Sequence, residues 1–390
     1  MKKKVVVLLI LFFTIFFIPS SMVKADGEIG KVKDLFPDNS LKGEIKLILN
    51  KGEEDYITRD EAAGITSLLL KDKSIENVKG IEIFSNLKYL NLEDNRITTL
   101  PAEIGTLKQL QFLYLGGNII SELPKEIGGL ILLEELSLRA NKLTTLSEEL
   151  GKLVNLRKID ISSNSLEKLP AGLKGCNKLE VLLADNNILA DLPEELGGLK
   201  KLLILDLRSN KLISLSPLYK DLDSLFYLDL AENNIYNIDE GAYKKILGIP
   251  GHYDLTEQKA IIKLANKGLV GEDYVIKALD ICRLNLGSGL EYYLISPDGQ
   301  RERLELEIKD NYLTVAGEYL TKEGSYVMEI QISDNQPDAF KGSVYQQIFM
   351  IDKVTILPAY NTNQYLIASL GIFVAGLLLI VVVRLVRKGK

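Results

Sequence analysis

Few side chains of this chain are suited to covalent chemistry. Its 390 residues include one histidine, His252, and two cysteines, Cys176 and Cys282. So few imidazoles and thiols argue against His-based catalysis and against a Cys/His zinc site. We found no nucleophile elbow, metalloprotease, P-loop, Cys-x-x-Cys or EF-hand pattern. Acidic pairs such as Glu148-Glu149 occur throughout, and nothing selects one of them. The sequence therefore predicts no catalytic residue, no metal ligand and no cofactor.

The distribution of charge narrows the class of partner. The net charge is -6, and it becomes -14 when the basic residues of the two ends are set aside, namely Lys2, Lys3, Lys4, Lys24, Arg384, Arg387, Lys388 and Lys390. Nucleic-acid binding needs clustered Lys and Arg for phosphate contacts. We therefore predict no nucleic-acid partner, and we look for recognition chemistry elsewhere in the chain.

An internal repeat of 23 residues organises the middle of the chain. The pattern L-x-x-L-x-L-x-x-N-x-L recurs with its asparagine at Asn95, Asn118, Asn141, Asn164, Asn187, Asn210 and Asn233. The alternating leucines predict short strands with one buried face. Because one unit cannot bury its own core, the units must stack. We predict that the asparagines form a structural ladder, each binding the backbone of a turn.

The repeat pattern resembles the leucine-rich repeat family over about residues 35–240. Several units add a second half, L-P-x-x-I/L-G-x-L, as at Leu100 to Leu107 and Leu192 to Leu199. The resemblance implies an α/β solenoid, the leucine-rich repeat horseshoe, over residues 65–240. Cys176 occupies a position that is leucine in other units, so we expect a buried, unreactive thiol.

The segment before the repeats has the features of a cap. Residues 26–64 contain apolar residues at helical spacing, such as Leu41 and Ile45, and a capping box from Thr58 to Glu61. A solenoid end is a bare apolar face that needs such a cover. The stretch from Phe36 to Leu68 resembles the amino-terminal cap of internalin-like bacterial surface proteins.

Two further segments follow the repeats. In residues 241–285 we predict a helical cap or linker, with helices from Leu255 to about Asn266 and from Asp273 to Ile281, and we expect the nearby His252 to be structural or exposed. In residues 286–358 the apolar period becomes two. This predicts short strands at 290–296, 304–308, 312–316, 325–333, 344–351 and 354–356, which form a small antiparallel sandwich. Gly324 to Val327 resembles bacterial immunoglobulin-like domains.

The two ends of the chain indicate where in the cell the protein is located. Residues 1–25 have the basic, apolar and small-residue parts of a secretory signal peptide. Residues 365–383 are apolar enough for one transmembrane helix, and residues 384–390 form a basic tail that should stay in the cytoplasm. We predict a single-pass protein of the cell membrane with its ectodomain outside. The tail also resembles a Gram-positive sortase signal, but Tyr360 and Asn361 replace its Thr and Gly, so we favour retention by the span.

The exposed strand positions of the repeats are the candidate binding site. They face the predicted concave side, and the residues we select there are Tyr89, Asn91, Phe112, Tyr114, Arg139, Asp160, Asp185, Asp206, Arg208, Tyr227 and Asp229. Three aromatic residues should cluster near one end, where they suit a binding anchor. The four aspartates should form an acidic column, which the two arginines break.

These observations favour a binding module over an enzyme. The leading hypothesis is a non-catalytic cell-surface protein that binds a protein or glycan through its concave face. The resemblance to internalin-like adhesins implies adhesion, host contact or envelope organisation. Two alternatives remain. One is an enzyme on the secreted side that uses Cys282, with the repeats selecting its substrate. The other is a structural spacer at the envelope.

Overall fold

The chain forms two compact units, which we describe separately. The computed structural model describes residues 27–352, except for 216–220, 239, 257, 271, 278–289, 307, 310–311 and 333–342. Unit 1 comprises Met1–Ile262, Ala278–Tyr292 and Glu329–Gln346, and unit 2 comprises Lys263–Lys277, Tyr293–Met328 and Gln347–Lys390. The predicted signal peptide, membrane span and basic tail lie outside the described residues. Within the described part, no helix has the length and apolar character needed to cross a membrane.

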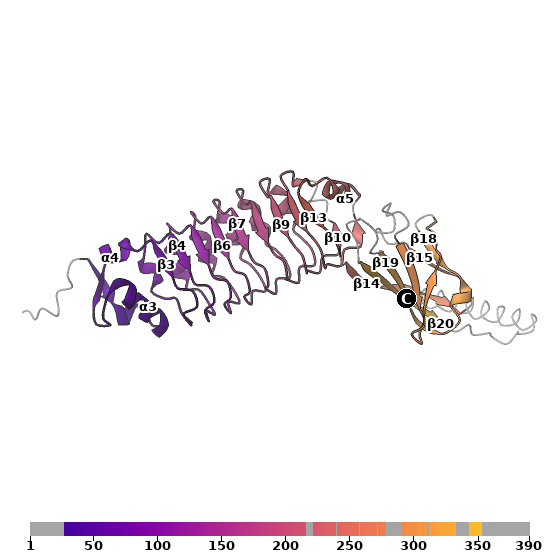
Figure 1. Cartoon of the computed structure of the whole chain (residues 1–390), viewed down its shortest axis with the longest axis horizontal. Helices are drawn as coiled ribbons and strands as arrows, with labels where there is room; N and C mark the ends of the chain where they lie inside the picture. Colours follow the sequence, from indigo (N-terminus) through magenta and orange to yellow (C-terminus); the bar gives the residue numbers. More distant parts are fainter. Residues whose placement is uncertain are drawn as a thin grey trace, which may run out of the picture. The chain divides into compact units, whose positions relative to one another are not determined.

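The repeats build a parallel sheet of nine strands (Figure 1). Its order is β13-β11-β9-β8-β7-β6-β5-β4-β3, so almost every strand pairs with the strand of the next repeat. The strands are β3 (Ser67–Leu69), β4 (Tyr89–Asn91), β5 (Phe112–Tyr114), β6 (Glu135–Ser137), β7 (Lys158–Asp160), β8 (Val181–Leu183), β9 (Ile204–Asp206), β11 (Tyr227–Asp229) and β13 (His252–Asp254). Equivalent residues of neighbouring repeats pair directly, as Leu90 does with Leu113. The 23-residue period therefore becomes a set of straight columns.

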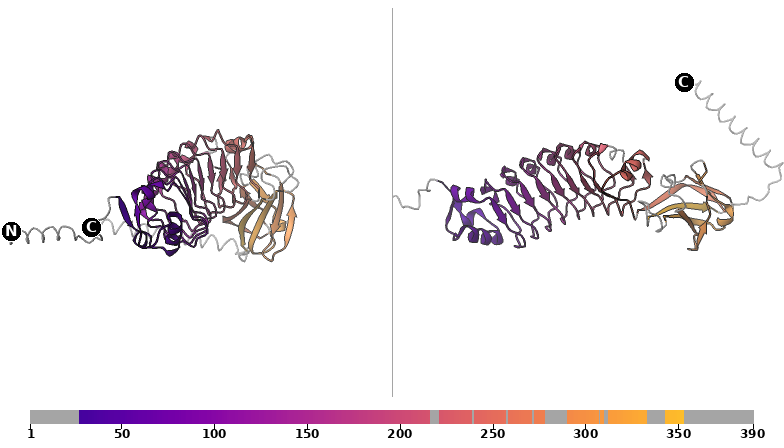
Figure 2. Two further views of the ribbon diagram at one scale, coloured as in Figure 1. Left: turned by 60° about the vertical axis from the view of Figure 1, so that its left-hand side comes forward. Right: turned by 45° about the horizontal axis from the view of Figure 1, so that its top comes forward.

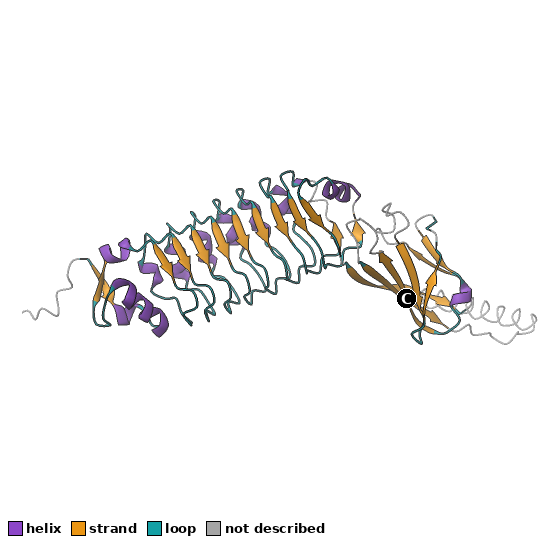
Figure 3. Ribbon diagram, in the orientation of Figure 1, coloured by secondary structure: helices purple, strands orange, loops and turns teal. Residues whose placement is uncertain are grey.

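Short 3-10 helices lie on the side of the repeats away from the sheet (Figures 2 and 3). They are η1 (Ile81–Ile83), η2 (Ala102–Thr106), η3 (Lys125–Gly129), η4 (Glu148–Lys152), η5 (Ala171–Gly175) and η6 (Glu194–Gly198). Proline stands before η2, η3, η5 and η6, where its fixed φ suits the helix start. The leucines of the repeat lie between helices and sheet, and nearly all are fully buried. Cys176 is part of this core and is also fully buried.

The seven asparagines bind backbone groups along the core. Asn141 donates from Nδ2 to the carbonyl oxygens of Leu115 and Leu138 at 3.0 Å each, and its Oδ1 accepts from the N–H of Ile120 at 3.0 Å. The other six asparagines repeat this pattern. An eighth rung is Gln258, whose Nε2 donates to the carbonyl of Leu230 at 2.8 Å. The ladder satisfies turn groups that would otherwise be buried without partners.

The amino-terminal segment packs against the first repeat. It contains β1 (Glu28–Lys31), α2 (Val32–Leu35), α3 (Asn39–Leu49), β2 (Tyr56–Thr58) and α4 (Arg59–Gly64). α4 begins with the capping box of Thr58 and Glu61. The ring of Phe36 stacks on that of Phe84, with centroids 6.1 Å apart. One oxygen of Asp38 caps α3 at the N–H of Leu41, and the other accepts from two backbone N–H groups that precede η1.

The segment after the repeats differs from its prediction. Within the last repeats, strands β10 (Ser214–Leu215) and β12 (Asn237–Ile238) pair in parallel, and helix α5 (Glu240–Leu247) follows the repeats. The helix predicted from Leu255 to Asn266 is wrong, because β14 (Lys259–Leu269) occupies it. The helix predicted from Asp273 is also wrong in its described part, which is β15 (Tyr274–Lys277). Both strands pair with distant segments, and such pairing outweighs local helix propensity.

Most of the later strands lie where the alternating pattern predicts them. They are β16 (Leu290–Ile295), β17 (Arg301–Leu304), β18 (Tyr312–Val315), β19 (Gly324–Ile332) and β20 (Val344–Asp352), with the 3-10 helix η9 (Gly317–Tyr319). One sheet has the order β14-β20-β19-β16-β17, and β15 pairs antiparallel with β18. The strand predicted at 304–308 is wrong in its described part, because β17 spans Arg301–Leu304 and shares only Leu304 with it. The strand predicted at 354–356 lies outside the described residues.

Candidate functional site

The outward side of the nine-stranded sheet, here called the sheet face, carries the candidate residues. In each strand the middle residue points into the core, as Leu90 and Leu113 do, and the first and third residues point outward. A further column lies two positions after each strand and includes Arg139, Asp185 and Arg208. Side chains gather in two clusters on this face, one near each end of the sheet.

The aromatic cluster consists of Tyr89, Phe112 and Tyr114 on β4 and β5. The ring centroid of Tyr89 lies 6.0 Å from that of Phe112 and 5.4 Å from that of Tyr114. All three side chains are half-buried, so they remain open to a partner. The hydroxyl of Tyr114 donates to Oε2 of Glu135 at 3.0 Å. Burial, together with the Glu135 carboxylate, raises the pKa of Tyr114 well above its usual range, so this phenol stays a neutral donor.

Leu69 adds an apolar side chain beside the aromatic cluster. It pairs with Asn91 across β3 and β4 and is 67% exposed, which is high for leucine. Asn91 itself accepts from the N–H of Glu93 through Oδ1 at 2.9 Å. The amino-terminal end of the sheet face therefore combines three rings and a leucine with the carboxylates of Glu93 and Glu135.

Aspartates form the second cluster, but the predicted column needs correction. Asp206 and Asp229 pair directly across β9 and β11, and Asp254 of β13 pairs with Asp229. Asp160 belongs to the same column, but Leu183 stands between it and Asp206. Asp185 lies two residues later, in the column of the arginines. The continuous run is thus Asp206, Asp229 and Asp254, and the prediction had missed its last member.

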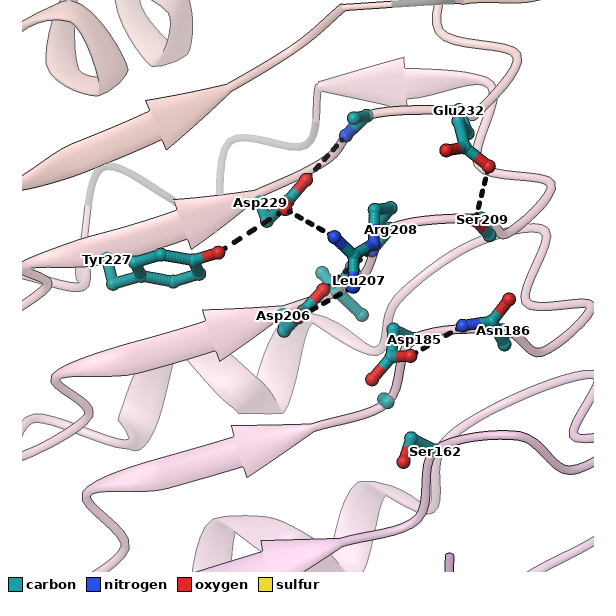
Figure 4. A network of polar contacts seen from close by, with 12 residues as sticks. Ser162, Asp185, Asn186, Asp206, Leu207, Arg208, Ser209, Tyr227, Asp229 and Glu232 are labelled. Atoms are coloured by element: carbon teal, nitrogen blue, oxygen red, sulfur yellow. Dashed lines mark hydrogen bonds and ion pairs between the residues drawn. The ribbon is translucent and has the colours of Figure 1, made fainter. Parts of the chain in front are cut away.

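Arg208 lies beside two aspartates of this run, Asp206 and Asp229 (Figure 4). Its guanidinium lies 3.9 Å from Oδ2 of Asp206 and 3.8 Å from Oδ2 of Asp229. The hydroxyl of Tyr227 contacts the same Asp229 oxygen at 3.4 Å. One guanidinium therefore faces several carboxylates, so the carboxyl end of the sheet face is strongly acidic.

Burial changes the ionisation of two of these aspartates. It raises the pKa of Asp206 to about 6, and the nearby carboxylates of Asp185 and Asp229 act in the same direction. The pKa of Asp229 is also raised, mainly by burial, although the N–H of Ala231 stabilises its charged form. The sheet face at this end thus gains negative charge as the pH rises through the weakly acidic range.

Asp206 should make the stability of the protein pH-dependent. We expect the free energy of unfolding to fall as the pH rises from about 4 to about 6, because the folded protein holds this proton more tightly than the unfolded chain. The full shift corresponds to about 3 kcal/mol, and hydration of the open face should reduce this to about 1–2 kcal/mol. Denaturant unfolding of the wild type and Asp206→Asn at pH 4 and pH 7.5 measures it.

Asn keeps the acceptor that Asp206 offers to the N–H of Arg208 at 3.1 Å, so the variant removes the charge alone. Asp206→Asn should be more stable than the wild type at pH 7.5 and similar to it at pH 4. Asp160→Asn is the control, since Ser137 and Leu183 flank Asp160 in its column. Equal effects of the two substitutions would contradict this explanation.

The remaining predicted residues lie apart from the two clusters. Asp160 accepts from the N–H and hydroxyl of Ser162, and Arg139 is exposed. Burial raises the pKa of the Cys176 thiol to about 11, which agrees with the predicted lack of reactivity. Cys282 lies outside the described residues. The geometry of the sheet face is therefore that of a recognition surface built from aromatic and acidic patches.

Comparison with known proteins identifies the repeats. Residues 67–138 match the family model "Leucine-rich repeat region", and residues 131–189 match "Leucine rich repeat". No curated protein sequence matches the chain significantly. Residues 67–189 therefore consist of leucine-rich repeats, in agreement with the fold.

Three solved structures are similar to parts of this chain. InlP from Listeria monocytogenes has 19% identity and a TM-score of 0.53, with 83% of this chain and 98% of that chain covered. At this identity the similarity concerns the fold alone. Internalin C2 from the same organism has 26% identity, a TM-score of 0.49 and coverages of 56% and 92%. A leucine-rich repeat protein of Leptospira interrogans has 30% identity and a TM-score of 0.44 over 50% of this chain, which spans only 55% of that protein.

Proposed function

We propose that this protein is a non-catalytic binding scaffold that holds a protein ligand on its sheet face. The observation that carries the proposal is the aromatic cluster of Tyr89, Phe112 and Tyr114, half-exposed on adjacent strands of a regular parallel sheet. Clustered aromatic side chains are the commonest anchors of protein interfaces. Their strands are fixed by ladder hydrogen bonds on both sides, so little conformational freedom is lost on binding.

The surroundings of the aromatic cluster favour a particular ligand chemistry. Leu69 extends the apolar surface, whereas the carboxylate of Glu135 and that of Glu93, 3.4 Å from Nζ of Lys71, border it. A protein segment with an apolar side chain next to Lys or Arg would satisfy both features, and the cation could also lie over a ring face. We therefore favour a protein ligand with a basic contact segment, and a glycan is the alternative outcome.

The site of action in this proposal is the cell surface of a bacterium. A signal peptide over residues 1–25 and a membrane span over residues 365–383, both inferred from the sequence, would place the sheet face outside the cell. Adhesion, host contact and envelope organisation are the roles that this placement allows. The internalin-like fold is compatible with each of them, and fold alone does not choose one.

Truncation of the aromatic cluster should abolish most of the affinity. We expect Tyr89→Ala, Phe112→Ala and Tyr114→Ala each to weaken ligand binding by about 2 kcal/mol, which is about 30-fold in the dissociation constant. The ligand is first captured by cross-linking on intact cells and then identified, and the purified pair is compared by calorimetry. Circular dichroism establishes that each variant is folded.

Ile119→Ala is the matched control, because Ile119 is an exposed apolar residue of the same repeats outside the strands of the sheet. Its affinity should equal that of the wild type. If the three aromatic variants bind the identified ligand as tightly as Ile119→Ala does, the aromatic cluster is not the binding site.

A further inference from the structure

The only imidazole of the chain lies beside two carboxylates. His252 and Asp254 occupy the ends of β13, where they pair with Tyr227 and Asp229 of β11. Because alternate residues of a strand share one side, all four side chains belong to the sheet face. One ligand atom each from Asp229, His252 and Asp254 can be chosen so that all three lie within 4.8 Å of one another. Such spacing lets three atoms surround one small cation.

Neighbouring groups hold the three side chains in place. Oδ1 of Asp229 accepts from the N–H of Ala231 at 3.0 Å, and Oδ1 of Asp254 accepts from the N–H of Thr256 at 2.8 Å. The His252 ring packs against Tyr227, with centroids 4.9 Å apart. Each carboxylate is therefore oriented through its Oδ1 atom, and Oδ2 of Asp229 has only the longer contacts with Tyr227 at 3.4 Å and Arg208 at 3.8 Å. Outer contacts of this kind position the ligands of a metal site.

Charge at this end of the sheet face favours a cation. Asp206 extends the run of carboxylates, and its neighbour Asp185 adds another. Arg208 supplies one positive charge at 3.8 Å from Asp229, beyond hydrogen-bonding distance, and its side chain is 43% exposed. It can remain near Asp206 while a cation binds on the other side of Asp229. A divalent ion would offset repulsion that Arg208 alone leaves in place.

The donor set selects the kind of cation. One nitrogen and two carboxylate oxygens suit Zn²⁺ and similar first-row ions, whereas Ca²⁺ requires six to eight oxygens. We propose that Asp229, His252 and Asp254 form a binding site for a divalent transition-metal ion, with Zn²⁺ the ion that fits best. His252 is exposed, so the fourth coordination position opens onto the sheet face. Water or a donor atom of a bound partner can complete the coordination.

The test uses the full chain without a polyhistidine tag, in detergent micelles, titrated with Zn²⁺. The chain contains a single histidine, so the imidazole carbon–proton NMR signal reports on one residue only. Equilibrium dialysis with metal analysis supplies the stoichiometry. We expect a saturable shift of that signal and one Zn²⁺ per chain.

Loss of one ligand should raise the dissociation constant at least ~10-fold, since even removal of an outer contact has an effect of ~10–100-fold. His252→Gln and Asp254→Asn are the test variants, measured by dialysis, and unfolding without metal establishes that each is folded. Asp160→Asn is the control, as an aspartate of the same column outside the triad. Equal weakening by Asp160→Asn, no effect of either test variant, or displacement of Zn²⁺ by equimolar Ca²⁺ would overturn the proposal in favour of nonspecific attraction to an acidic surface.

Discussion

Replacement of Asn141 by alanine should destabilise the repeat unit by about 4 kcal/mol, because it leaves several buried backbone groups without partners. The Asn141 side chain is the hydrogen-bond partner of the carbonyl groups of Leu115 and Leu138 and of the N–H of Ile120. These groups lie between stacked coils, where water cannot replace the lost amide without opening the stack. The cavity left by the side chain adds to the loss. Chemical denaturation monitored by circular dichroism measures the change.

Asn86→Ala tests whether the loss of stability is specific to the ladder asparagines. Asn86 is exposed and makes one side-chain hydrogen bond, to the carbonyl of Ala63 at 3.0 Å. Its replacement should change the free energy of unfolding by less than about 1 kcal/mol. A similar loss in both variants would show that the ladder has no special role in stability.

The ladder also explains where the repeats end. Its last rung is Gln258, which follows Asn233 after 25 residues rather than 23. The backbone N–H of Gln258 donates to the Ser343 hydroxyl at 2.9 Å, and its carbonyl accepts from the N–H of Val344. The final coil is thus tied to the start of β20 instead of to another repeat. The two extra residues lie before β13, so Gln258 follows its strand at the same distance as Asn233 follows β11, and it makes equivalent carbonyl contacts.

Sequence periodicity was sufficient to predict the repeats but not their last coil. Seven units share a spacing of 23, so strands β4 to β9 and β11 follow directly from the leucine pattern. The coil that carries β13 has Tyr253 and Gln258 where the pattern requires leucine and asparagine, and helix α5 lengthens it. Without that coil Asp254 could not be assigned to the sheet face, and His252 was expected only to be structural or exposed. The proposed metal site was therefore invisible to the motif search, since its ligands meet only through strand pairing.

The acidic column shows a second limit. The side-chain period of a strand is two, so a shift of two residues keeps a side chain on the same face but moves it to another column. The sequence-based column combined Asp185 with Asp160 and Asp206, although the register places Leu183 between them. The aromatic cluster avoided this error because its residues occupy matched positions, as Tyr89 and Phe112 do. Side chains of neighbouring repeats meet when they occupy the same position of the 23-residue period, and residue type alone does not show this.

Close stacking of the coils leads to the second large expected effect. Gly151 of η4 lies against η5, and a Cβ atom built on Gly151 would come within 2.1 Å of the carbonyl oxygen of Gly172. That neighbour is backbone, so it cannot rotate away as a side chain could. Gly151→Ala must therefore force the two coils apart. We expect a loss of about 3 kcal/mol in the free energy of unfolding, at the upper end of the usual range for overpacking.

Gly198→Ala provides the comparison, because Gly198 closes the equivalent 3-10 helix η6 and its nearest neighbour, Cβ of Lys174, would be 4.0 Å from an added Cβ. This substitution should be neutral or should stabilise the protein by up to about 1 kcal/mol, because alanine reduces the freedom of the unfolded chain. The same denaturation experiment compares both variants. Opposite changes in the free energy of unfolding would show that position 151 requires glycine because two backbones come close together there. Equal effects would mean that the coils can separate there without loss, and that the stack depends on its leucines and asparagines alone.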